Sequence, residues 1–224
     1  MTEPVVQCIV GMTGCGKTTK AECLMLDHSR VLYRDAIGHD YADGLVFSDR
    51  PALETYWRRV YRGPFRMVHR PLDPLEDFGR ECHLVRECGS LGYVVDEAHL
   101  YCKAGKIIDR EFTRLIGTGR HYDIDLVCVS QAPKHLAEFL RSQAHEWFVF
   151  MLKEPGHVEY VVQRCGGLVT REHVLALERF EYLHYTDYGP DGTPAVWLCR
   201  DDIVSGTTDR VQLASGLGQH DASE

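Results

Sequence analysis

The chain has 224 residues, of which 44% are hydrophobic and 26% are charged, and its formal net charge is −8. Its longest apolar run, Trp147–Leu152, is far shorter than the ~18 residues that a membrane helix needs, so we expect no transmembrane segment. The acidic N-terminus does not resemble a signal peptide, and we therefore expect a cytoplasmic protein with reduced cysteines. The negative net charge argues against broad nucleic-acid binding, so any such contact requires a local basic surface.

The first predicted strand, residues 5–10, runs directly into GMTGCGKT at Gly11–Thr18, and a predicted helix at 17–27 follows. A G-x-x-x-x-G-K-[ST] loop between a strand and a helix wraps its backbone N–H groups around a polyphosphate. Lys17 is expected to reach the β- and γ-phosphates, and Thr18 to hold Mg²⁺ through its hydroxyl. The guanine-reading motif [NT]-K-x-D is absent, which argues against a GTPase. We therefore predict an ATP site formed by Gly11, Met12, Thr13, Gly14, Cys15, Gly16, Lys17, Thr18 and Thr19.

Strands and helices alternate along the rest of the chain. Further strands are predicted at residues 30–36, 45–48, 65–69, 91–96, 123–130, 147–152, 182–185 and 195–198. Further helices are predicted at 51–61 with Asp49 as its cap, and at 74–88, 108–117, 134–143, 156–164 and 171–179. This alternation indicates an α/β fold with a mostly parallel sheet and helices on both faces. We expect one domain over residues 1–204 and a flexible tail over 205–224, which is rich in Gly, Ser, Thr and Asp.

An apolar strand, Tyr93–Val95, ends in the carboxylates Asp96 and Glu97. In P-loop enzymes an Asp at such a strand end binds Mg²⁺, while the adjacent Glu can activate an attacking water as general base. The alternative interpretation is a helix cap after a core strand. The next residues complete the letters D-E-A-H, but 224 residues cannot supply the two tandem domains of helicases with that motif. His99 is therefore interpreted as incidental.

Gln131 follows the strand at 123–130, and ligands of open α/β sheets lie beyond the carboxyl ends of the strands. We predict that its amide senses the γ-phosphate or holds the attacking water. Arg120 precedes the same strand and should lie too far from its own nucleotide, so we predict that it serves a neighbouring subunit as an arginine finger. Arg114 and Arg141 are competing candidates for that role.

The stretch Trp57–Arg70 (WRRVYRGPFRMVHR) is the one evident basic cluster in the sequence, with its arginines interleaved with aromatic residues. Arginine near aromatic side chains suits contacts to phosphates and bases. A charged helix face followed by a strand explains the same pattern, and the sequence does not decide between the two.

Three segments resemble the FtsK/HerA clan of P-loop DNA-pumping ATPases: Gly11–Thr18, Tyr93–His99 and Gly119–Pro133 (GRHYDIDLVCVSQAP). The last is the most diagnostic, and the resemblance covers roughly residues 4–165. A stand-alone motor of this size is similar to the genome-packaging ATPases of tailless icosahedral viruses with internal membranes. That resemblance implies a RecA-like core, a hexameric ring, double-stranded DNA as cargo, and work in the host cytoplasm or on the virion, with a capsid vertex or membrane protein as a further partner.

Two other functions compete with DNA packaging. The segments also resemble zonula-occludens-toxin-like proteins of filamentous phages, which implies an assembly ATPase acting on protein partners. A small-molecule kinase of similar size is the third hypothesis, but Glu97 and Gln131 speak against it because they favour transfer to water. Stimulation of ATP hydrolysis by DNA separates the first hypothesis from the others.

Overall fold

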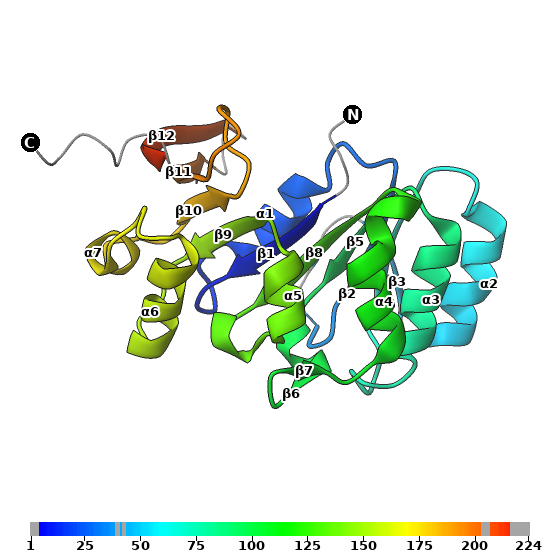
Figure 1. The fold of residues 1–224 in the computed structure, drawn as a ribbon. Helices are drawn as coiled ribbons and strands as arrows, with labels where there is room; N and C mark the ends of the chain where they lie inside the picture. The colour runs from blue at the N-terminus through cyan, green and yellow to red at the C-terminus, as the bar shows by residue number, and fades with distance from the viewer. Residues whose placement is uncertain (1–4, 39–40, 42–43, 203–206, 216–224) are drawn as a thin grey trace, which may run out of the picture.

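The computed structural model describes residues 5–38, 41, 44–202 and 207–215 (Figure 1). Its strands are β1 (Val6–Val10), β2 (Arg30–Arg34), β3 (Leu45–Phe47), β4 (Phe65–His69), β5 (Leu91–Val95), β6 (Cys102–Lys103), β7 (Lys106–Ile107), β8 (Ile124–Ser130), β9 (Glu146–Phe150), β10 (Glu181–Thr186), β11 (Ala195–Asp202) and β12 (Thr207–Ser215). Its α-helices are α1 (Lys17–Leu24), α2 (Arg50–Val60), α3 (Phe78–Cys88), α4 (Arg110–Thr118), α5 (Glu138–Gln143), α6 (Pro155–Arg164) and α7 (Arg171–Leu175). Short 3₁₀ helices are η1 (Ala98–Tyr101), η2 (Gly119–Tyr122) and η3 (Pro133–His135).

Ten of these strands form one sheet in the order β12-β11-β10-β9-β1-β8-β5-β2-β4-β3. The seven strands from β9 to β3 are parallel, whereas β10, β11 and β12 continue the sheet as an antiparallel meander. In Figure 1 this meander extends away from the helices α2, α3 and α4 at the other end of the sheet. The predicted α/β class with a mostly parallel sheet is confirmed.

Side chains of successive strand residues enter two different cores, as the alternation of a strand requires. Cys8 and Val10 of β1 pack into the larger core, which also contains buried residues of α2 through α7. Ile9 lies between them and packs into the smaller core with Ala21 of α1 and with Met25, the C-cap of that helix. Helices thus cover both faces, and among the described helices α1 is the one that contributes to the smaller core.

The strand register brings the ends of three neighbouring strands to one edge of the sheet. Val10, the last residue of β1, lies opposite Ser130, the last residue of β8. Val95, the last residue of β5, lies opposite Cys128 of β8. The residues that follow these strands, among them Asp96 and Gln131, therefore emerge at this carboxyl edge.

The helix predicted over residues 74–88 begins later, at Phe78. The Asp73 carboxylate accepts a hydrogen bond from the Leu75 N–H at 2.9 Å, which holds the chain in a turn. The fully buried guanidinium of Arg34 donates to the carbonyls of Pro74 and Glu76 at 2.7 and 3.0 Å. These carbonyls therefore accept their hydrogen bonds from Arg34 and do not depend on the backbone hydrogen bonds of a helix.

The helix predicted over residues 134–143 is instead divided into η3 and α5. Leu136 and Ala137 between them are extended and fully buried, and the Ala137 N–H lies 3.3 Å from Cys102 Sγ. Burial of these two side chains against the β6–β7 hairpin, which the sequence pattern did not predict, separates the two short helices.

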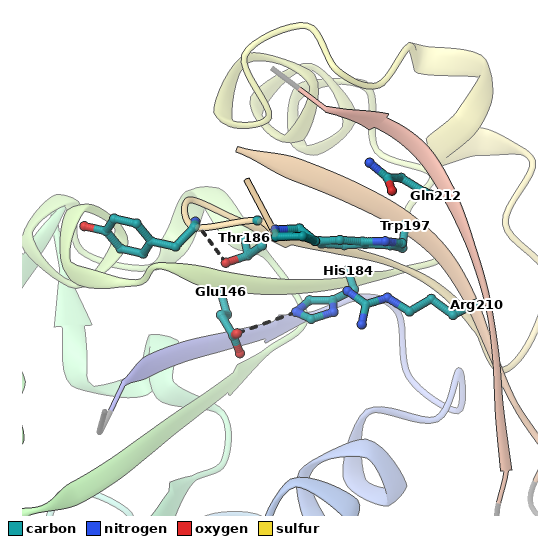
Figure 2. Close-up of a pocket in the computed structure, with 9 residues that line it drawn as sticks. Glu146, His184, Thr186, Trp197, Arg210 and Gln212 are labelled. Atoms are coloured by element: carbon teal, nitrogen blue, oxygen red, sulfur yellow. Dashed lines mark hydrogen bonds and ion pairs between the residues drawn. The ribbon is translucent and has the colours of Figure 1, made fainter. Parts of the chain in front are cut away.

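The tail predicted from Ser205 is wrong for Thr207–Ser215, because these residues form β12. Residues 205–206 and 216–224 lie outside the described residues. β12 pairs with β11 along its whole length, and the Arg210 guanidinium lies 3.7 Å from the centre of the Trp197 ring (Figure 2). Backbone hydrogen bonds and this cation–π contact hold a strand whose side chains are mostly exposed, which explains why apolar periodicity does not predict it.

Candidate functional site: a P-loop cleft at the carboxyl edge of the sheet

The P-loop connects β1 to α1 through a backbone that glycine alone fits at two positions. A Cβ on Gly11 (φ 153°) would lie 2.6 Å from Phe150 Cβ, and a Cβ on Gly16 (φ 113°) would lie 2.9 Å from Phe180 Cδ1. The Lys17 ammonium donates to the carbonyl of Met12 at 2.7 Å within the same loop. The helix α1 begins at Lys17, directly after the loop, and the partial positive charge of its N-terminus favours a bound phosphate.

Two carboxylates follow β5 next to the P-loop. Asp96 and Glu97 are 2% and 3% exposed, and Asp96 Oδ1 accepts a hydrogen bond from the Glu97 N–H at 2.9 Å. Glu97 has a left-handed backbone (φ 46°, ψ 46°), which is unfavourable for a residue with a Cβ. Because of this strained turn, the two consecutive carboxylates need not point in the same direction. One can therefore bind a metal ion while the other acts as a base.

Gln131 and His99 hold the Glu97 carboxylate from two sides. Gln131 Nε2 donates to Glu97 Oε1 at 2.5 Å, and His99 Nδ1 lies 3.1 Å from Glu97 Oε2. Burial alone would raise the pKa of Glu97, but the contacts with His99 and Gln131 bring the pKa below its usual range. Glu97 is therefore ionised at neutral pH, the state that a general base requires. His99, interpreted from the sequence as incidental, is a neighbour of this carboxylate.

Predicted residues from three separate motifs line one cleft of about 300 Å³. Its lining is Thr13, Gly14, Gly16, Lys17, Thr18, Thr19, Asp96, Glu97, Gln131, Arg179 and Phe180. Thr18 and Asp96 supply oxygen donors, which suit Mg²⁺. Among the described residues no group of three or more His, Cys, Asp or Glu side chains is arranged to hold a metal ion. The donors present fit an ion that takes its remaining ligands from phosphates and water.

Arg179 and Phe180 also line this cleft, although no sequence motif predicts them. The predicted helix over 171–179 ends at Leu175, and the chain then turns onto the P-loop. Arg179 Nε donates to the Gly14 carbonyl at 3.1 Å, and the Phe180 N–H donates to the Cys15 carbonyl at 3.1 Å. The backbone of Phe180 is left-handed (φ 69°), a conformation that is unfavourable for a residue with a Cβ. The contact between Phe180 and the P-loop forms in spite of this cost.

Replacing Arg179 with alanine is expected to weaken ATP binding about tenfold, because the charged hydrogen bond that holds the Gly14 carbonyl is lost. The affinity for a non-hydrolysable ATP analogue, measured by calorimetric titration, tests this. Arg171→Ala is the matched control, since Arg171 is an exposed arginine that lies 3.8 Å from Glu159 on the protein surface. Equal affinities of the two variants would contradict a role of Arg179 in nucleotide binding.

Arg120 lies in η2 just before β8, at the edge of the sheet opposite the cleft. It is exposed and has no ion pair among the described residues. The two competing arginines are engaged within the chain: Arg114 Nη1 lies 2.5 Å from Glu111 Oε1, and the Arg141 guanidinium lies 4.7 Å from the centre of the Tyr160 ring. The finger role of Arg120 stays a prediction, and its position is compatible with service to another subunit.

The basic stretch Trp57–Arg70 is divided between the end of α2 and β4. Arg66 donates to the carbonyls of Met25, Leu26 and His28, and Arg70 Nε lies 2.7 Å from Asp35 Oδ2. These two arginines therefore stabilise the fold, and only the exposed arginines around the end of α2 are left for a partner.

Comparison with known proteins finds similar solved structures but no similar sequence family. No family model and no curated protein sequence matches it. Among solved structures, the genome-packaging NTPase B204 of Sulfolobus turreted icosahedral virus 2 in complex with sulfate aligns at a TM-score of 0.67 and 16% identity, over 88% of this chain and 96% of that chain. Its complex with ATP-γS aligns at 0.66, also with 16% identity, over 88% and 97%.

A bacterial protein has a similar structure. VirB4 of Thermoanaerobacter pseudethanolicus aligns at a TM-score of 0.51 and 13% identity, over 92% of this chain and 88% of that chain. No helix among the residues described here is long and apolar enough to cross a membrane. The chain therefore shares its fold with these solved structures, among them a viral genome-packaging NTPase.

Proposed function

We propose that this chain is an ATPase that uses Mg²⁺ and ATP to move double-stranded DNA, and that it packages a viral genome into a capsid. One observation carries the proposal: the P-loop, Asp96, Glu97 and Gln131 face a single cleft, in the arrangement that hydrolysis of a nucleotide needs. The fold shared with the packaging NTPase B204 supports the viral role.

Each residue of the cleft has a separate task in this proposal. The P-loop N–H groups and Lys17 bind the phosphates, and Thr18 and Asp96 hold Mg²⁺, which supplies positive charge against the phosphate oxygens. Gln131 orients the attacking water, and Glu97 accepts its proton. The Gln131–Glu97 hydrogen bond favours this assignment over a kinase, because both groups serve a water molecule and a kinase must exclude water.

The working form in this proposal is a homo-oligomeric ring, a hexamer, in the host cytoplasm or on the virion. The position of Arg120 supports it, since this arginine lies before β8, at the edge of the sheet opposite its own cleft. A ring of this kind also needs a docking partner, for which a capsid vertex or a membrane protein is suited.

The test is the ATPase rate of size-fractionated protein with and without duplex DNA. The expected result is Mg²⁺-dependent hydrolysis that DNA accelerates in the oligomeric fraction. Hydrolysis without any response to DNA would favour the assembly ATPase that acts on protein partners. Absence of hydrolysis in every fraction would reject the proposal altogether.

A further inference from the structure

The lysines of this chain are distributed very unevenly. There are six, and Lys17 and Lys20 are buried in α1 beside the P-loop. The other four follow three strands at the carboxyl edge: Lys103 and Lys106 lie in the β6–β7 hairpin after β5, Lys134 in η3 after β8, and Lys153 in the loop after β9. We refer to these four residues as the lysine rim.

The loops that carry the lysine rim are in contact with one another. The Glu138 N–H donates to the Gly105 carbonyl at 3.2 Å, which joins the start of α5 to the β6–β7 hairpin. The rings of His135 and His157 lie 5.5 Å apart, which joins η3 to α6. In Figure 1 the hairpin lies directly below α5. The four lysines thus belong to one continuous edge of the molecule.

All four rim lysines are exposed, and within the described part of the chain none has an ion pair or a hydrogen-bonded side-chain partner. Many arginines, in contrast, are paired with carboxylates, as Arg80 is with Glu54 and Arg164 with Asp187. Two acids share the rim, Glu138 and Glu154, and Glu154 is held by His157 at 3.3 Å. In a chain of net charge −8, four exposed ammonium groups without an ion pair form a local positive surface at this edge.

We propose that the lysine rim is the surface that contacts the phosphate backbone of duplex DNA, an inference that rests on the proposed function. Flexible lysines suit this partner because they neutralise phosphates without reading bases. The loops also suit the coupling of DNA to hydrolysis. Lys134 lies three residues after Gln131, and the hairpin follows η1, which carries His99 beside Glu97. A shift of either loop on DNA binding changes the surroundings of the general base.

A rival surface exists at the opposite edge of the sheet. Arg59 and Arg62 at the end of α2 are exposed, and α2 leads from the carboxyl end of β3 back to the start of β4. DNA bound there would lie away from Gln131 and Glu97. The two surfaces therefore make opposite predictions for paired variants.

The experiment compares Lys134→Ala/Lys153→Ala with the matched control Arg59→Ala/Arg62→Ala, each of which removes two exposed positive charges. Binding of a fluorescent DNA duplex is measured by anisotropy over a series of salt concentrations. We expect the slope of log K against log salt to fall by about two in the lysine variant and to stay unchanged in the arginine variant. Basal ATPase without DNA is expected to stay unchanged in both, which also shows that the variants are folded.

The outcomes separate the inference from the proposed function. If wild-type protein responds to DNA and the lysine variant keeps the wild-type slope, the lysine rim is not the contact surface. If the arginine variant loses the slope instead, DNA binds at the opposite edge, and the inference is overturned while the proposed function stands. If wild-type protein hydrolyses ATP and neither binds nor responds to DNA, both fail. The variant Lys103→Ala/Lys106→Ala repeats the test on the hairpin.

Discussion

Replacing Glu97 with glutamine is expected to lower ATP turnover by ~10²–10⁴-fold while nucleotide and Mg²⁺ binding stay close to those of the wild type. Glutamine keeps the shape of the side chain and retains an oxygen that can accept the hydrogen bond from Gln131. Unlike a carboxylate, however, it cannot take a proton from water. Steady-state ATPase rates and titration with a non-hydrolysable analogue measure the two effects separately.

The matched control for this prediction is Lys17→Ala, which should lose nucleotide binding itself because Lys17 is the phosphate-binding cation of the P-loop. A Glu97→Gln protein with near-wild-type turnover would remove Glu97 from the mechanism. A Glu97→Gln protein that no longer binds nucleotide would show that the carboxylate supports the cleft rather than the reaction.

Replacing Arg120 with alanine is expected to leave ATP binding intact and to slow hydrolysis ~10³-fold or more. β8 spans seven residues, so Arg120 lies about 23 Å or more from Gln131 at ~3.3 Å per residue. An arginine side chain cannot cover that distance. A catalytic role of Arg120 is therefore possible only toward the nucleotide of an adjacent subunit.

Mixing the two defective proteins tests this arrangement between subunits. In mixed rings of Arg120→Ala and excess Lys17→Ala protein, some sites combine an intact P-loop with an intact arginine from the neighbour, and partial activity should return. If mixed rings form and stay inactive, either Arg120 is not the finger or all subunits must fire together. The same mixture with Arg114→Ala or Arg141→Ala decides between those two outcomes, because a different finger would then be revealed by restored activity.

The parts of the cleft that the sequence predicts are those encoded by local patterns. Gly11, Gly16 and Lys17 belong to one short motif, and Asp96 and Gln131 directly follow apolar strands. In a parallel sheet such residues must emerge at the same edge, so their convergence follows from strand direction alone. The structure brings them into one cleft for that reason.

The parts that the sequence does not predict depend on contacts between distant segments. Arg179 reaches a P-loop carbonyl across 165 residues, through a turn that interrupts an apparent helical pattern. His99 approaches Glu97 because of the left-handed backbone at Glu97, which local propensity disfavours. The lysine rim exists only because three loops are adjacent in space. Its residues are too far apart in the sequence to form a basic run. Trp57–Arg70 does form such a run, but two of its arginines, Arg66 and Arg70, make contacts within the fold.

The antiparallel meander has a thermodynamic consequence for the P-loop. The ammonium of Lys20, in α1, donates to the Tyr182 hydroxyl at 2.6 Å, and that hydroxyl donates to Asp201 at 2.9 Å. Strands β10 and β11 are thereby connected to the helix that begins at the phosphate site. A ligand that binds only when this helix is in place reduces the population of molecules in which the two strands have locally unfolded. Local unfolding of the meander and nucleotide affinity are therefore linked. Nucleotide binding stabilises the two strands against local unfolding, and a change that destabilises the strands lowers the apparent nucleotide affinity.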